Sequence, residues 1–278
     1  YVFLLLYAKF QEKSVVSLNL KPQEATIRRG IRITDRLFII GMGLLVIAML
    51  SPLIALVVRS LTFEGGYATT QIGNLFSNER GSYFYLSPLM IIWNSLRFAF
   101  ATVIISLTLG TIVSYFLTGS KKRGGSIRDA IFMLPLGVSA VTLGFGYIIA
   151  LSRPPVDIRG SWIILVIAHS LVAYPFVIRS LLPVLQGFVP NLREAASLLG
   201  ATPARVFFFI DLPIIAPALL VGATFAFAVS MGEFGASLLL VRPEFMTIPV
   251  AIFRFLGLPG AANLGNALTM SSLLMAVV

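Results

Sequence analysis

Long apolar stretches alternate with short polar segments that hold most of the charges. An α-helix needs about 20 apolar residues to cross a bilayer. Five stretches reach that length and predict spans over residues 37–58, 89–117, 130–151, 162–182 and 216–241. A shorter run, 264–278, crosses only if further chain follows it. The pattern predicts an all-α, polytopic transmembrane helical bundle.

Two of the predicted spans contain helix-breaking residues. The third holds Pro135 and several glycines, and the fourth holds Pro175 beside His169. Such breaks are tolerated in membranes where neighbouring helices or a water-filled path satisfy the freed backbone groups. After the fifth span, residues 242–263 are expected to form a loop.

Composition supports the membrane assignment. The 278 residues are 58% hydrophobic and 12% charged, whereas soluble domains are roughly half apolar and a quarter charged. There are no cysteines, which excludes disulfides and thiolate metal sites. The formal net charge of +10 lies in loops without interleaved aromatic residues, which argues against nucleic acid as a partner and favours contact with anionic lipid.

The distribution of Lys and Arg predicts the orientation. The segments 9–36, 121–128 and 179–205 carry seven, four and three basic residues, and the three segments on the opposite side, 59–80, 153–159 and 242–254, carry two each. Basic loops face the cytoplasm. Residues 191–213 are therefore expected on the cytoplasmic side of a prokaryotic plasma (inner) membrane. The domain organisation expected is the tail of a preceding transmembrane helix over 1–8, a basic cytoplasmic linker over 9–36, and a transmembrane domain over 37–278.

Residues 191–213, NLREAASLLGATPARVFFFIDLP, carry their own helix start and stop signals. Asn191 and Glu194 form a capping-box pattern, and Gly200 is placed to end the helix in the left-handed conformation. Pro203 suits the first position of a second helix, and Pro213 is expected to close the segment. Alone, these signals describe either a docking hairpin or a capped hairpin lying on the membrane.

The spacing in this segment resembles the EAA loop of ABC importer permeases. It reads Glu194-Ala195-Ala196, three residues, Gly200, nine residues, Ile210, one residue, Leu212-Pro213. The resemblance implies that the first short helix docks in a groove of a cytoplasmic ATPase subunit. Small alanines permit close approach, and leucines supply apolar anchors. The implied coupling residues are Glu194, Ala195, Ala196, Leu198, Leu199, Gly200, Ile210, Leu212 and Pro213.

Further motifs resemble the ferric iron and thiamine permeases within this family. They cover about residues 35–278 and comprise Asn94-Ser95-Leu96, the stretch LPLGVSAVTLGFGY from Leu134, His169-Ser170-Leu171 through Tyr174-Pro175, Gly232-Glu233-Phe234-Gly235, and Arg242-Pro243-Glu244-Phe245. Several are shared with sulfate- and molybdate-type permeases. The resemblance implies the type I importer permease fold with about six spans, iron or thiamine as substrate, and a position as the second half of a fused two-unit permease.

Four residues are candidates for the translocation path: Glu233, His169, Gly232 and Tyr174. A carboxylate inside a span is costly unless it faces water or a partner, so Glu233 either lines the path or caps and bonds a neighbouring helix. His169 either lines the path or forms hydrogen bonds between helices, and the second reading is favoured.

No GxxxxGK[ST] loop and no catalytic set of residues is visible, which predicts a transport subunit and not an enzyme. The chain is expected to bind no cofactor, with ATP and Mg²⁺ on the partner ATPase. The other expected partners are an extracytoplasmic substrate-binding protein, a second permease half and the lipid bilayer. The alternative is a secondary transporter or channel driven by an ion gradient, with Glu233 and His169 as ion sites.

Overall fold

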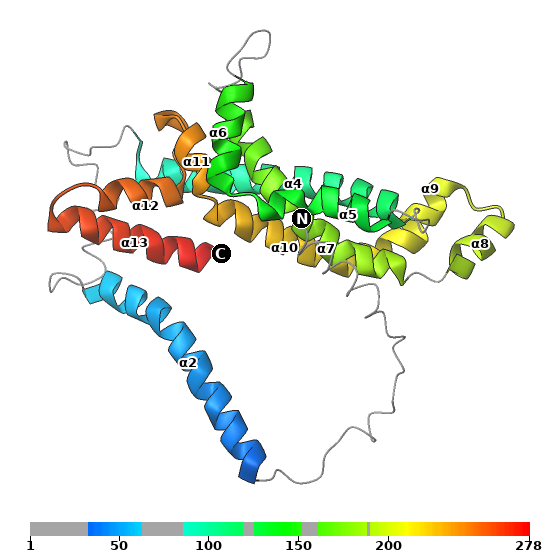
Figure 1. The fold of residues 1–278 in the computed structure, drawn as a ribbon, viewed down its shortest axis with the longest axis horizontal. Coiled ribbons are helices and arrows are strands. Elements are labelled where there is room, and N and C mark those ends of the chain that lie inside the picture. The colour runs from blue at the N-terminus through cyan, green and yellow to red at the C-terminus, as the bar shows by residue number, and fades with distance from the viewer. Residues whose placement is uncertain (1–32, 63–85, 119–124, 152–160, 188–189) are drawn as a thin grey trace.

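The computed structural model describes residues 33–62, 86–118, 125–151, 161–187 and 190–278, and these residues are helical or in turns, with no strand among them (Figure 1). The expected stub over 1–8 and most of the expected linker lie outside the described residues. Helix α2, Ile33–Thr62, begins before residue 37, so the last residues assigned to the linker are helical.

The core of the molecule is a bundle of three long helices: α4 (Pro88–Thr118), α7 (Ile163–Gln186) and α10 (Leu212–Gly232). Small residues allow their backbones to approach, as is common between membrane helices. A Cβ atom on Gly110 would lie 2.6 Å from Val177 Cγ1, and one on Gly222 would lie 3.3 Å from the Val177 Cα. The predicted second and fourth spans are thus confirmed as helices.

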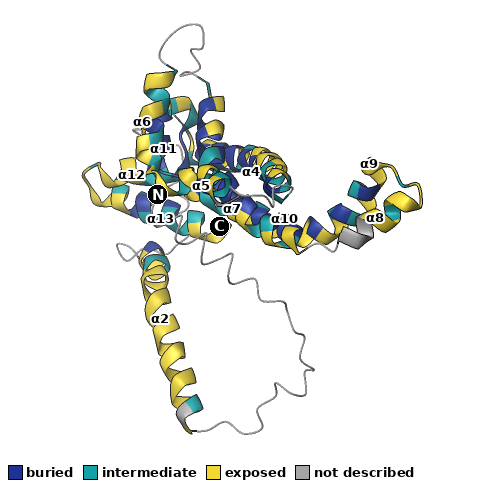
Figure 2. Cartoon of the chain, turned by 45° about the vertical axis from the view of Figure 1, so that its right-hand side comes forward, coloured by how far each residue is buried: buried dark blue, intermediate teal, exposed yellow. Residues whose placement is uncertain are grey.

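Helix α2 lies largely apart from this bundle. It contacts α13 (Ala261–Val277), where Ser272 Oγ donates to Ser60 Oγ at 2.9 Å. Figure 2 shows its surface exposed along most of its length. It is long and apolar enough to cross a membrane, so its exposed side chains suit lipid or another membrane protein.

The predicted third span is a broken helix. The segments Ile127–Gly137 and Ala140–Ala150 meet at 95°, and the turn follows the short 3₁₀-helix Leu134–Gly137. Helix α5 (Gly125–Met133) precedes the turn and α6 (Ala140–Ala150) follows it. Pro135 lies at the start of the 3₁₀-helix, where its missing N–H is tolerated. The predicted break in the third span is confirmed.

The predicted fifth span is also wrong at both of its ends. Helix α9 (Pro203–Val206), the π-helical turn η4 (Phe207–Asp211) and α10 follow one another without interruption, so Pro213 does not close the segment. Leu212 N–H donates to the Phe207 carbonyl, the i to i−5 pairing of a π-turn. At the other end the helix stops at Gly232, and a separate helix α11 (Gly235–Leu240) follows.

The expected loop over 242–263 contains structure of its own. A 3₁₀ turn η5 (Pro243–Phe245) leads into α12 (Ile248–Leu256), which packs on α13 around Val250, Phe255 and Met270. Within the described residues, four helices are suited to cross a membrane, or five if the bent pair counts as one span. The apolar helix α13 has 17 residues, below the usual crossing length, as its short apolar run predicted; with α13 counted, these helices agree with the predicted bundle of about six spans.

Candidate functional site

The EAA segment, residues 191–213, folds into the short helix α8 (Pro190–Leu198) and the first turns of the long continuous helix that begins at Pro203. The capping-box pattern predicted that Asn191 precedes α8, but Asn191 lies in its first turn. The side chains of residues 190–193 lie outside the described part. Thr202 precedes α9 and its Oγ1 accepts from Arg205 N–H at 3.4 Å, with Pro203 first in the helix as predicted.

Gly200 ends the first helix in the way its sequence position predicts. Its φ of +80° lies in the left-handed region, which a side chain makes costly. Gly200 N–H donates to the Ser197 carbonyl and Ala201 N–H to the Ala196 carbonyl, both at 3.0 Å. This pair of bonds is the Schellman motif, and it turns the chain sharply after the two leucines.

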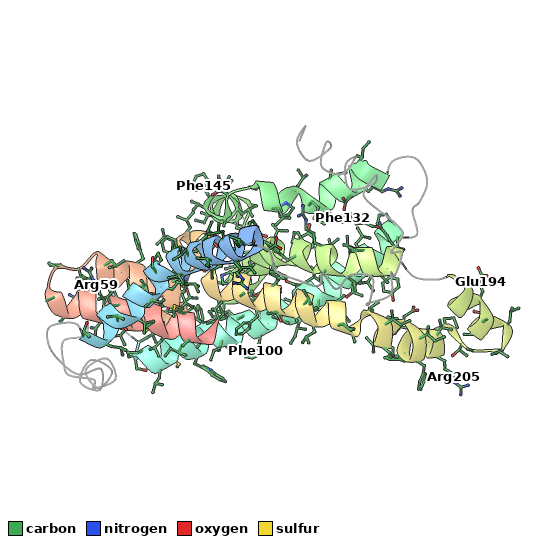
Figure 3. The ribbon with its side chains drawn as sticks, turned by 90° about the horizontal axis from the view of Figure 1, so that it is seen from below. Arg59, Phe100, Phe132, Phe145, Glu194 and Arg205 are labelled. Carbon is green, nitrogen blue, oxygen red and sulfur yellow. The ribbon has the colours of Figure 1, made fainter. Side chains whose placement is uncertain are left out.

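The turn leaves the leucines in solvent. Leu198 and Leu199 are each 88% exposed, and Glu194, Ala195 and Gly200 are also exposed. Figure 3 shows Glu194 and Arg205 at one end of the molecule and Arg59 at the other, as the predicted orientation requires of loops on opposite sides of a membrane. Two neighbouring exposed leucines at the end of a polar helix are suited to insert into an apolar groove of another protein.

The second half of the EAA motif joins this hairpin to the bundle. Ile210 and Leu212 are partly buried and Pro213 is exposed, on the π-turn and at the start of α10. Between them Asp211 is 6% exposed, and its Oδ2 accepts from the Tyr115 hydroxyl of α4 at 3.3 Å. The sequence analysis missed Asp211 and Tyr115. The available signal was a single carboxylate within the apolar run FFFIDLP.

Glu233 lies in the helix break between α10 and α11, residues 233–234. It is 8% exposed, and its Oε1 accepts from Ala236 N–H at 2.9 Å. A carboxylate in this position satisfies one of the backbone donors that a helix start leaves unpaired. The geometry corresponds to the capping alternative, and a place on the path stays a prediction. Gly232 beside it is exposed, and a Cβ there would meet nothing within 4 Å.

His169 lies on α7 directly behind this break and is 1% exposed. Its Nδ1 is 2.8 Å from Ser230 Oγ on α10, and its Nε2 is 2.7 Å from Ser237 Oγ on α11. Tyr174, one turn further along α7, donates its hydroxyl proton to the Phe132 carbonyl of α5 at 2.7 Å. The structure therefore brings His169 together with Glu233 and Gly232 around the break, and places Tyr174 at a separate contact.

Comparison with known proteins gives the family. No protein-family model matches the sequence. The molybdenum transport system permease protein ModB of Haemophilus influenzae is 31% identical over 198 residues, which cover 66% of this chain and 86% of that protein. The chain belongs to the ABC importer permeases.

Other similarities agree with this family. The sulfate transport system permease protein CysT of Salmonella typhimurium is 30% identical over 194 residues, covering 64% of this chain and 70% of that protein. A bacterial ABC transporter that imports the acidic polysaccharide alginate has the same fold, with a TM-score of 0.66 at 16% identity over 90% of this chain and 96% of that chain. The ABC importer permease is an inner-membrane transport subunit and not an enzyme, and permeases of this family work with an ATPase and a substrate-binding protein.

Proposed function

We propose that this permease receives the force of ATP hydrolysis through the EAA segment, which docks on the ATPase from the cytoplasm. ATP and Mg²⁺ bind to that partner, and a second permease half completes the translocation path. The proposal is supported by one observation above all, the exposure of Leu198 and Leu199 on a sharply turned helix at the end of the molecule opposite Arg59. A secondary transporter or channel would have no use for such a surface.

The test is a change of both leucines to alanine in the complete permease. Each leucine that fills a partner groove contributes to affinity as an interface anchor, so the Leu198→Ala/Leu199→Ala variant should bind its ATPase at least about tenfold more weakly. Affinity is measured by titrating purified ATPase onto permease in nanodiscs. Leu220→Ala is the matched control, because Leu220 is 70% exposed on α10 within the membrane span. Equal ATPase affinity of the double variant and this control would refute the docking role.

We also propose that the path carries an oxyanion of the molybdate and sulfate type. Two relatives at about the same identity carry these names, one for molybdenum and one for sulfate transport. The expectation of ferric iron or thiamine finds no such support. The Glu233 carboxylate accepts a hydrogen bond from Ala236 N–H. The helix break around Glu233 and Gly232 is proposed to border the path, with His169 behind it.

Calorimetric titration of the cognate binding protein tests the substrate. Molybdate and sulfate should each give a binding isotherm or be displaced from the protein as purified, and ferric iron and thiamine should give none. Binding of ferric iron or thiamine without oxyanion binding would overturn the substrate proposal and leave the docking proposal intact.

A further inference from the structure

The helix break divides the outer part of the molecule between two groups of helices. At Glu233 the backbone leaves the helical region, with φ of −71° and ψ of 111°, and α11 starts two residues later. Helix α10, before the break, packs on α7 and α4. Helix α11, after the break, packs chiefly on α6, the outer arm of the bent span.

The contact between α11 and α6 is close enough to make them one unit. A Cβ on Gly144 would lie 3.0 Å from the Ala236 Cα, and one on Gly235 would lie 3.0 Å from Val141 Cγ2 and 3.2 Å from Ala140 Cβ. Backbones that touch through glycine and alanine leave little freedom for one helix to slide on the other. The α6–α11 pair therefore moves, if at all, as a body.

Apolar side chains attach this pair to the bundle without fixing its orientation. Ala236 and Leu240 of α11 pack in a cluster with Phe98, Ile164 and Leu165. Burial of apolar surface is favourable but has no direction, so such a contact tolerates rotation better than a hydrogen bond does.

Beside the Glu233 cap on Ala236 N–H, a directional contact crosses the break through the bundle: the histidine bridge, Ser230–His169–Ser237. His169 belongs to the bundle, and so does Ser230, whereas Ser237 belongs to α11. The two ring nitrogens point in opposite directions from a rigid ring, so a single side chain fixes the distance between the last turn of α10 and the first turn of α11. Both serines are buried, at 4% and 0% exposed, and water does not compete for these bonds.

We propose that His169 is a positioning residue, which holds the α6–α11 pair in one orientation relative to α4, α7 and α10 and so sets the shape of the translocation path at the break. This inference rests on the proposed function, since it requires that the break borders the path. It assigns separate roles to the two bonds. The bond to Ser230 lies within the bundle and orients the ring, and the bond to Ser237 crosses the break.

The two serines supply a matched pair of variants. Ser230→Ala and Ser237→Ala each remove one hydroxyl and leave one imidazole nitrogen without its partner. Both variants should therefore lose a similar amount of stability from the unpaired buried nitrogen. Only Ser237→Ala cuts the bond across the break. The triple variant His169→Leu/Ser230→Ala/Ser237→Ala removes every polar group of the bridge and leaves none of them unpaired, so it separates positioning from stability.

The orientation is measured directly by paired spin labels on introduced cysteines, and these 278 residues contain no other cysteine. Val221→Cys on α10 with Leu238→Cys on α11 spans the break, and Val221→Cys with Ile104→Cys on α4 stays within the bundle; all three positions are exposed. In the complete permease in nanodiscs, Ser237→Ala and the triple variant should broaden the distance distribution of the first pair. Ser230→Ala should leave it narrow, and the second pair should not change.

The functional measurement is the rate of ATP hydrolysis by the complex of permease and ATPase. It is measured without the binding protein and after addition of the binding protein with the ligand that it retains on purification. Ser237→Ala and the triple variant should lose about three- to thirtyfold of the stimulation by binding protein at unchanged basal hydrolysis. Equal effects of the two serine variants, or an unchanged distribution in the triple variant, would overturn the inference. If the binding protein did not stimulate ATP hydrolysis even in the unaltered complex, the proposed function would be refuted. The distance measurement would still test the histidine bridge.

Discussion

The EAA segment and the helix break place their polar and apolar groups in opposite ways. The EAA segment satisfies its backbone locally, through Gly200 and Thr202, and leaves Leu198 and Leu199 exposed. The break buries a carboxylate and an imidazole and satisfies them through partners on two helices, α10 and α11. In the proposed function the first region is completed by the ATPase, whereas the polar groups of the second find their partners within this chain.

This difference bears on how each region responds to substitution. A change in the EAA segment should alter binding of the partner and leave the bundle folded, because few contacts with the bundle depend on it. A change at the break should alter the bundle itself, because an unpaired polar group there lies in a buried environment. Stability and ATPase affinity, measured side by side, separate the two cases.

The largest effect is expected from Gly200→Val. A β-branched residue at φ of +80° is strained by about 1–2 kcal/mol or more, so the Schellman turn should open and reorient both leucines. ATPase affinity should fall by about tenfold or more, with little change in the thermal unfolding of the permease. Titration of ATPase onto permease in nanodiscs measures it.

Gly146→Val is the control for that substitution. Gly146 lies on α6 with nothing within 4 Å of an added Cβ and without a positive φ. It should keep normal ATPase affinity. If Gly200→Val also kept it, the turn would have no part in docking.

A smaller effect is expected at Glu233, where two substitutions divide the capping role from the path role. Glu233→Ala removes the acceptor for Ala236 N–H and should destabilise the permease by about 1–2 kcal/mol. Glu233→Gln retains an acceptor oxygen and should unfold near the temperature of the unaltered protein. Thermal unfolding in detergent and uptake in vesicles are measured together, and loss of uptake in stable Glu233→Gln would place the charge itself on the path.

The smallest effect is expected at the contact that joins the EAA segment to the bundle. Tyr115→Phe removes the hydrogen bond to Asp211 and should cost about 1 kcal/mol of stability. A double-mutant cycle with Asp211→Asn measures the coupling between the two side chains in unfolding and in ATPase affinity. Additive effects in both would show that this contact does not link the two regions.

Local signals in the sequence predicted the parts of the fold that local physics determines. The apolar lengths located α2, α4 and α7, Pro135 located the bend of the third span, and Gly200 located the left-handed turn. Each depends on residues within one helical turn or on composition. The spacing of the EAA motif gave the family for the same reason, because the whole motif lies within 20 residues.

The remaining features depend on contacts between distant segments. The hydropathy of residues 216–241 is continuous, so the helix stop at Gly232 follows only from the Glu233 cap and the packing of α11 on α6. Pro213 predicted a helix end, but the π-turn before it absorbs the missing N–H and the helix continues. The amphipathic helix α12 is too short to be predicted as a span, and its buried face is recognisable only with α13 beside it.

The unbroken helix from Pro203 to Gly232 has a mechanical consequence. Thirty residues of helix are about 45 Å long, with helix α8 of the EAA segment at one end and the helix break at Glu233 at the other. A tilt of about 5° imposed at the hairpin end displaces the far end by about 4 Å, more than the length of a hydrogen bond. With the ATPase docked on the EAA segment as proposed, a small rotation of its surface would displace the last turn of α10 relative to the neighbouring helices.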